Sequence, residues 1–131
     1  MKPMDPARLK EIDLFASLSD EELGRLADVL GEVSIEEGEE LLQAGTPPHQ
    51  MFAIEEGAVE VRRNGETVAT IGAGEVVGER GMVTRGLRNA SVVATGPVRA
   101  VFLTEDQLRR LNREHPEIED RLRAILEDRG E

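Results

Sequence analysis

Cysteine, tryptophan and tyrosine are all missing from the sequence, and these absences exclude several kinds of site. Without cysteine the chain can form no disulfide, no thiolate zinc site and no cysteine nucleophile. Phenylalanine, present three times, is the only aromatic residue type, so a platform on which nucleic-acid bases stack would be difficult to build. The sequence has no apolar run of roughly 18 residues, as a transmembrane helix requires, and its first residues lack the apolar core of a signal peptide. We therefore expect a cytoplasmic protein that does not insert into membranes.

Basic residues are also scarce: 16 Lys and Arg stand against 27 Asp and Glu, a formal net charge of −11. Such a surface repels polyanions, so we expect no nucleic-acid partner. The exception is the segment 78–103, in which Glu79 is the one acidic residue against four arginines. A basic segment in an acidic protein is typical of a solvated loop or of a pocket for a small anion, and the charge alone leaves both interpretations open.

The pattern along the 131 residues predicts one domain with helices at both ends and strands between them. Ser19 to Glu22 form a capping box that opens a predicted helix over 19–30, ended by Gly31, and Thr104 to Gln107 form a second one. Between the helices, short alternating segments are separated by glycine-containing turns, and Asn64-Gly65 is a type I′ hairpin signal. This spacing favours a β-sandwich or barrel.

The segment 72–94 has the composition of an anion-binding loop. Glycines interrupt its strand pattern, and a helical turn beginning near Glu79 would present free amides that Arg88 could assist in binding an anion. The Glu79 carboxylate is a poor neighbour for a phosphate but a good acceptor for a sugar hydroxyl. This combination suits a ligand with a phosphate and a ribose, although glycine-rich turns are also common in loops that bind nothing.

The same residues resemble a known family. Gly78-Glu79 followed by Arg88-Asn89-Ala90-Ser91-Val92 is similar to the phosphate-binding cassette of cyclic nucleotide-binding domains, found in catabolite activator proteins, kinase regulatory subunits and cyclic nucleotide-gated channels. The resemblance extends to Leu14-Phe15, to Gly38-Glu39 and to Met51–Ile54 before Gly57. It implies a mainly β fold, a β jelly-roll barrel with an N-terminal helix and C-terminal helices. The single domain 1–131 would divide into a helical segment 1–31, a β-roll 32–103 with the cassette at 78–91, and helices over 104–129.

The resemblance also implies a role for individual residues. Glu79, beside the Gly78 backbone, would accept the ribose 2′-hydroxyl, and Arg88 would pair with the exocyclic oxygens of the cyclic phosphate. The amides of Gly81 and Asn89 would bond the same phosphate. Val61 and Ile71 would line the base pocket, and Leu122 or Ile125 would cap the base. The implied ligand-binding residues are Val61, Ile71, Gly78, Glu79, Arg80, Gly81, Met82, Arg88, Asn89 and Ala90.

Three positions depart from the family pattern, the mildest being Gly81, which replaces the more usual alanine. Arg80 stands where an apolar residue is usual, so its side chain either points outward or adds charge near the phosphate. Asn89 occupies a place where a hydroxyl is associated with recognition of guanine, and its side-chain amide can bond either purine. The choice between cAMP and cGMP therefore stays open.

Three classes of function follow from these residues. The first is a non-catalytic sensor that binds cAMP or cGMP, moves its C-terminal helices and acts on an effector protein or domain in trans. The second is a protein-interaction module that keeps the fold without the ligand, but the presence of both Glu79 and Arg88 favours binding. The third, a metal enzyme of the cupin type, needs clustered histidine and carboxylate ligands, whereas His49 and His115 are the only histidines. We expect no catalytic residue, no metal and no cofactor other than the nucleotide ligand.

Overall fold

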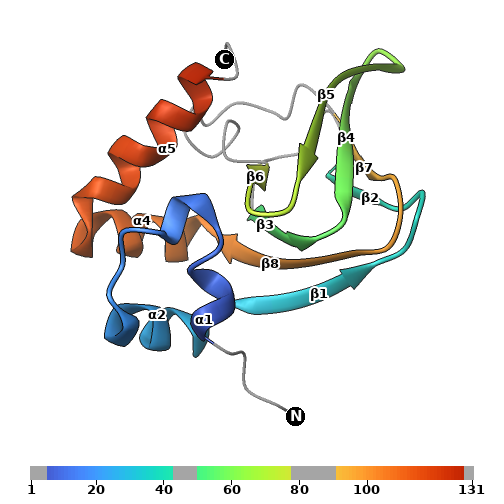
Figure 1. Cartoon of the computed structure of the whole chain (residues 1–131). Coiled ribbons are helices and arrows are strands. Elements are labelled where there is room, and N and C mark those ends of the chain that lie inside the picture. Colours follow the sequence, from blue (N-terminus) through green and yellow to red (C-terminus); the bar gives the residue numbers. More distant parts are fainter. Residues whose placement is uncertain (1–5, 43–49, 78–90, 129–131) are drawn as a thin grey trace.

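The computed structural model of the chain describes residues 6–42, 50–77 and 91–128. Within these ranges a helical segment comes first, the strands follow, and two helices close the chain (Figure 1). The first segment comprises α1 (Pro6–Leu9), the 3-10 helix η1 (Asp13–Phe15) and α2 (Asp20–Ala27). The closing helices are α4 (Glu105–Glu114) and α5 (Pro116–Asp128). The order of helices, strands and helices is the one that the sequence predicts.

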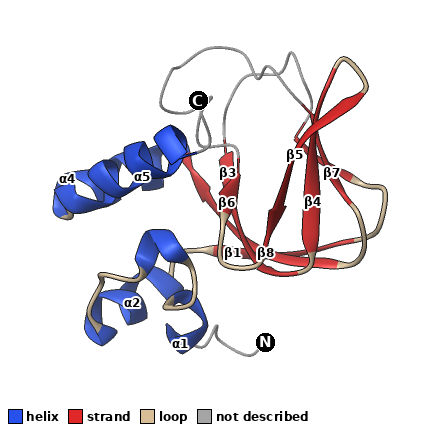
Figure 2. Cartoon of the chain, turned by 45° about the horizontal axis from the view of Figure 1, so that its top comes forward, coloured by secondary structure: helices blue, strands red, loops and turns tan. Residues whose placement is uncertain are grey.

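The strands form two antiparallel sheets. They are β1 (Gly31–Ile35), β2 (Glu40–Leu42), β3 (Gln50–Glu56), β4 (Ala58–Arg63), β5 (Glu66–Gly72), β6 (Val76–Val77), β7 (Ser91–Ala94) and β8 (Val98–Thr104). The first sheet has the order β1-β8-β3-β6, and the second has the order β2-β7-β4-β5. Figure 2 shows the helices gathered on one side of the strands. The mainly β jelly roll with flanking helices is confirmed.

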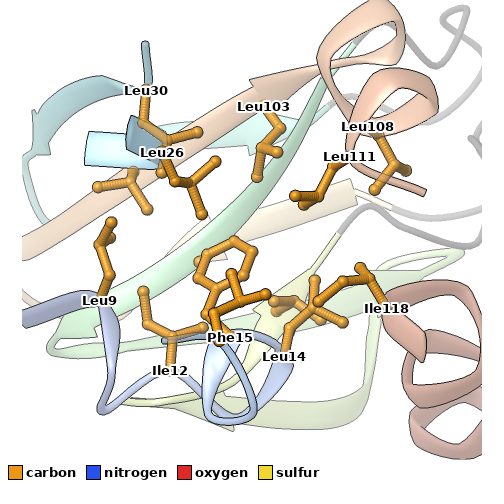
Figure 3. Packing of buried hydrophobic residues seen from close by; sticks show 14 of the residues in the cluster. Leu9, Ile12, Leu14, Phe15, Leu26, Leu30, Leu103, Leu108, Leu111 and Ile118 are labelled. Carbon is orange, nitrogen blue, oxygen red and sulfur yellow. The ribbon is translucent and has the colours of Figure 1, made fainter. Parts of the chain in front are cut away.

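The first sheet is buried on both faces, and this is why its central strands read as continuous apolar runs. Along β3, Met51 and Ala53 face the helices, whereas Phe52 and Ile54 face the interior of the roll. The buried side chains on the outer face, among them Met51 and Ala53, form the helical cluster, which joins α1, η1, α2, α4 and α5 to the sheet (Figure 3). The buried side chains on the inner face, among them Phe52 and Ile54, belong to the roll cluster, which fills the space between the two sheets. The first sheet therefore separates two hydrophobic cores.

Both predicted capping boxes are present. The Ser19 hydroxyl accepts from the Glu22 amide and the Glu22 carboxylate accepts from the Ser19 amide. Thr104 and Gln107 make the same reciprocal pair at the start of α4. The predicted end of the first helix is wrong, because α2 stops at Ala27 and Gly31 is already the first residue of β1.

Gly31 is required by packing rather than by a helix end. It lies opposite Phe102 in the β1–β8 register, and a Cβ atom at Gly31 would lie 2.2 Å from the Phe102 ring. The Phe102 ring in turn packs on Phe52, with ring centroids 6.1 Å apart. A glycine at this position therefore makes room for an aromatic pair in the roll.

The β4–β5 hairpin closes with the predicted turn. Asn64 and Gly65 have φ values of 54° and 80°, as a type I′ turn requires. Further along the hairpin the register shifts, so that Val68 has no counterpart between the pairs Val61–Ala69 and Arg62–Thr67. This is a β-bulge in a strand at the edge of the second sheet.

Candidate functional site

The structure describes the two ends of the predicted cassette. β6 ends at Val77, at the edge of the first sheet, and β7 begins at Ser91, inside the second sheet. The predicted cassette residues between these strands lie outside the described residues, and they are Gly78, Glu79, Arg80, Gly81, Met82, Arg88, Asn89 and Ala90. The fold thus gives the cassette one strand from each sheet as its boundaries.

Val61 and Ile71, the two predicted base-pocket residues in the described chain, belong to the roll cluster. Ile71 is only 3% exposed and lies opposite Val59 in the β4–β5 register. Val61 is half-buried and lies opposite Val92, the second residue of β7. The structure therefore brings both side chains to the interior of the roll, and Val61 lies next to the strand that follows the cassette.

The two residues predicted to cap the base lie elsewhere. Leu122 is 1% exposed and belongs to the helical cluster, and Ile125 is half-buried against the same cluster. The first sheet separates this cluster from Val61 and Ile71. In this conformation the structure does not bring Leu122 together with the roll interior, so contact with a base there would require α5 to move.

Asp13 links the β5–β6 turn to the last helix. Its backbone amide donates to the Gly74 carbonyl at 2.9 Å, and its carboxylate pairs with Arg121 of α5. The turn is fixed to β3, because the Gly74 amide donates to Ile54 at 2.8 Å. Sequence reasoning missed Asp13, because its partners Gly74 and Arg121 lie far away in the sequence.

Ion pairs also tie α1 to the first sheet. Arg8 pairs with Glu32 of β1 and with Glu55 of β3. The hydrogen bond to Glu32 is the largest of the causes that raise the pKa of Arg8. Burial lowers this pKa, but the hydrogen bond to Glu55 raises it again, and the net effect is upward. The Glu55 side chain is 5% exposed and its Oε1 has no partner within the described part of the chain. This pair therefore anchors the N-terminal helix through a buried carboxylate.

Two described arginines, Arg99 in the basic segment and Arg62 in β4, form ion pairs with carboxylates. Arg99, in β8, pairs with Glu56 at 3.1 Å, at the end of β3 remote from β6. Arg62 pairs with Glu60 at 2.9 Å, and this hydrogen bond, with that from Thr67, lowers the pKa of Glu60. Arg99 is therefore placed away from the start of the cassette.

The described residues offer neither a metal-binding cluster nor a membrane-spanning helix. Among residues 6–42, 50–77 and 91–128, no cluster of three or more His, Asp or Glu side chains has the arrangement of a metal site. No helix in those ranges is both long enough and apolar enough to cross a bilayer.

Comparison with protein families matches residues 32–115 to the cyclic nucleotide-binding domain. The chain belongs to this family. The type II regulatory subunit of cAMP-dependent protein kinase from Drosophila melanogaster is 34% identical to it over 108 residues, which cover 79% of this chain and 29% of that protein. The chain spans between 10% and 29% of the length of the curated relatives that it matches.

Solved structures agree with this membership. A cyclic nucleotide-binding domain from Methylobacillus flagellatus aligns with a TM-score of 0.75 at 28% identity, covering 94% of this chain and 72% of that one. The regulatory subunit of a cAMP-independent protein kinase A from Trypanosoma brucei aligns with a TM-score of 0.82 at 25% identity, covering 92% and 45%. Because the same fold occurs in a protein described as cAMP-independent, the ligand has to be argued from site residues rather than from the fold.

Proposed function

We propose that this cyclic nucleotide-binding domain is a regulatory sensor that binds cAMP or cGMP at the segment 78–91. The observation that carries the proposal is the motif Gly78-Glu79 with Arg88-Asn89-Ala90, located between β6 and β7 of this family's fold. In this proposal Glu79 accepts the ribose 2′-hydroxyl and Arg88 neutralises the cyclic phosphate. A charged pair with the phosphate, shielded from water, is among the stronger polar interactions available to a protein.

The described residues support the location of the base. Val61 and Ile71 provide an apolar surface in the roll, and Val61 lies directly beside β7. The remaining members of the implied site are Gly78, Arg80, Gly81, Met82 and Asn89 with Ala90, whose contacts with the ligand stay predictions.

We further propose that binding is transmitted to α5 and from there to an effector protein or domain in trans. A path of direct contacts supports this, because the turn that leads into β6 accepts a hydrogen bond from Asp13, whose carboxylate holds Arg121 of α5. A ligand shifts such an equilibrium only by its difference in affinity for the two states. The output would therefore depend on α5 having a docked and a less docked position.

Calorimetry with cAMP and cGMP in parallel tests the site. Arg88→Ala should weaken binding by about 2–5 kcal/mol, as expected when one partner of a desolvated charge pair is removed. Glu79→Ala should reduce the preference for the nucleotide over its 2′-deoxy analogue. Arg99→Ala is the matched control, because Arg99 belongs to the same basic segment but pairs with Glu56. This variant should bind the nucleotide with the affinity of the wild type.

The possible failures point to different conclusions. Wild-type protein that binds neither nucleotide would favour an interaction module that keeps the fold without a ligand. Binding that Arg88→Ala leaves unchanged would mean that the phosphate is held by other residues.

A further inference from the structure

A groove of about 450 Å³ runs between α2 and α4. Its floor is apolar, formed by Leu18, Leu26 and Leu111 of the helical cluster. Val29, at 55% exposure, lies at one end and is one of the two large apolar side chains exposed in the described chain. Figure 3 shows Leu26 and Leu111 reaching the cluster from opposite sides.

Polar contacts close the groove at both ends. At one end the Gln107 side chain donates to the Val29 carbonyl at 2.9 Å, which joins the start of α4 to the residues after α2. At the other end His115 Nδ1 lies 2.8 Å from a Glu22 carboxylate oxygen. The two helices therefore run antiparallel.

The middle of the groove is basic and its ends are acidic. Arg25 of α2 and Arg110 of α4 line it three residues beyond Glu22 and Gln107, so they face one another at mid-length. Neither arginine has a carboxylate within 4 Å in the ranges that the structure describes, although the charge of Arg25 acts on Glu22, one turn earlier, from a greater distance. The remaining charged rim residues lie towards the ends: Glu22 and Glu114 near His115, and Asp106, which pairs with Arg109 at 3.4 Å, near Gln107.

We propose that this groove binds an amphipathic helix of a partner protein, with acidic side chains at its centre and basic side chains at both ends. Two antiparallel helices with an apolar floor offer the surface on which a third helix packs. The charge order along the groove, acidic, basic and acidic, is complemented by the order basic, acidic and basic. An acidic group at the centre would supply the carboxylate that Arg25 and Arg110 lack. This inference does not depend on nucleotide binding.

Two synthetic helical peptides of identical composition test the proposal. Each has about 16 residues, just above the length of about 12–15 below which isolated helices are marginal in water, and three leucines on one face. One carries two glutamates at its centre and a lysine pair at each end, with the remaining acids placed on the far face. The second exchanges the central glutamates with terminal lysines. Binding is measured by titrating labelled full-length protein and following amide chemical shifts.

The acidic-centre peptide should bind at least tenfold more tightly and shift amides of α2 and α4. Arg110→Glu, alone and with Arg25→Glu, should abolish or reverse this preference. Arg113→Glu makes the same charge change on α4 outside the groove and should leave the preference intact.

Equal affinity for the two peptides, or shifts confined to other elements, would overturn the proposal. So would concentration-dependent dimerisation of the protein alone that Arg110→Glu abolishes, because the occupant would then be a second copy of the chain.

Discussion

Two glycines respond in opposite ways to the addition of one methyl group. A Cβ at Gly31 would lie 2.2 Å from the Phe102 ring, whereas a Cβ at Gly24, inside α2, has no neighbouring atom within 4 Å. Gly31→Ala should therefore lower the free energy of unfolding by about 1–3 kcal/mol through overpacking. Gly24→Ala should raise it by about 0.5–1 kcal/mol, because alanine loses less backbone entropy in a helix. Urea unfolding of both variants measures the difference.

Equal effects at the two positions would contradict this reasoning. In that case the conformational preference of glycine, and not the space around the Phe102 ring, would set the energy at Gly31.

The capping box of α2 makes stability depend on pH. The hydrogen bond from the Ser19 backbone, then that with its side chain and the charges of His115 and Arg25, lower the pKa of Glu22. A carboxyl whose pKa is lower in the folded state stabilises the protein above its unfolded value and loses this contribution as pH falls through its folded value. The cost of Glu22→Gln should therefore be largest near neutral pH and shrink towards pH 3. Chemical unfolding across this range is the measurement.

Glu21→Gln is the control on the same turn, since Glu21 is exposed and is not the residue of the capping box. A cost for Glu22→Gln that stays constant from neutral to acidic pH would mean that shape, rather than charge, makes Glu22 fit the cap.

At the scale of elements, α5 offers the sharpest test of transmission. Adding cAMP or cGMP should slow amide hydrogen exchange across 117–129 as well as 78–90, because a helix that is held by one apolar face opens at low cost. In Arg121→Ala the cassette should still be protected while the response of α5 is reduced, since the pair with Asp13 is lost. Arg123→Ala is the control, because Arg123 pairs with Glu119 within α5 itself.

Protection of 78–90 without any change in α5 of the wild type would make α5 a fixed part of the core. Signalling would then need another route.

Local sequence signals were enough to predict those elements whose stabilising contacts join neighbouring residues. The two capping boxes and the Asn64-Gly65 turn were predictable because their partners lie within three residues. The end of α2 was not, because Gly31 is placed by a ring some seventy positions away, Phe102, and not by the helix. β6 was missed since its two residues pair with β3, which lies far earlier in the sequence.

The features of the candidate site also fall into those with a local sequence signal and those formed by distant residues. The cassette is predicted from a compact motif and stays a prediction, and the described residues Val61 and Ile71 lie in the interior of the roll. The contact of Asp13 with Gly74 and Arg121 joins three distant parts of the chain. No local pattern encodes such a contact.

At the scale of the whole molecule, the net charge of −11 predicts a dependence on salt. Like charges repel most strongly in the compact state, and the screening length falls from about 30 Å at 0.01 M to about 8 Å at 0.15 M. The melting temperature should therefore rise over this range of NaCl. KCl, which gives the same ionic strength, should act equally, and a fall in melting temperature would show that the surface ion pairs outweigh the repulsion.

The bulge at Val68 has a consequence for how the protein behaves at high concentration. β5 ends the second sheet, and residues 66–70 are all exposed, with Glu66 their only charge. A flat strand of this composition is a template for pairing with another chain, whereas a bulge twists the edge and interrupts the row of hydrogen-bonding groups. Among the described strands, the one residue of β5 without a register partner therefore makes this edge irregular, and an irregular edge is a poorer template for fibril-like aggregation.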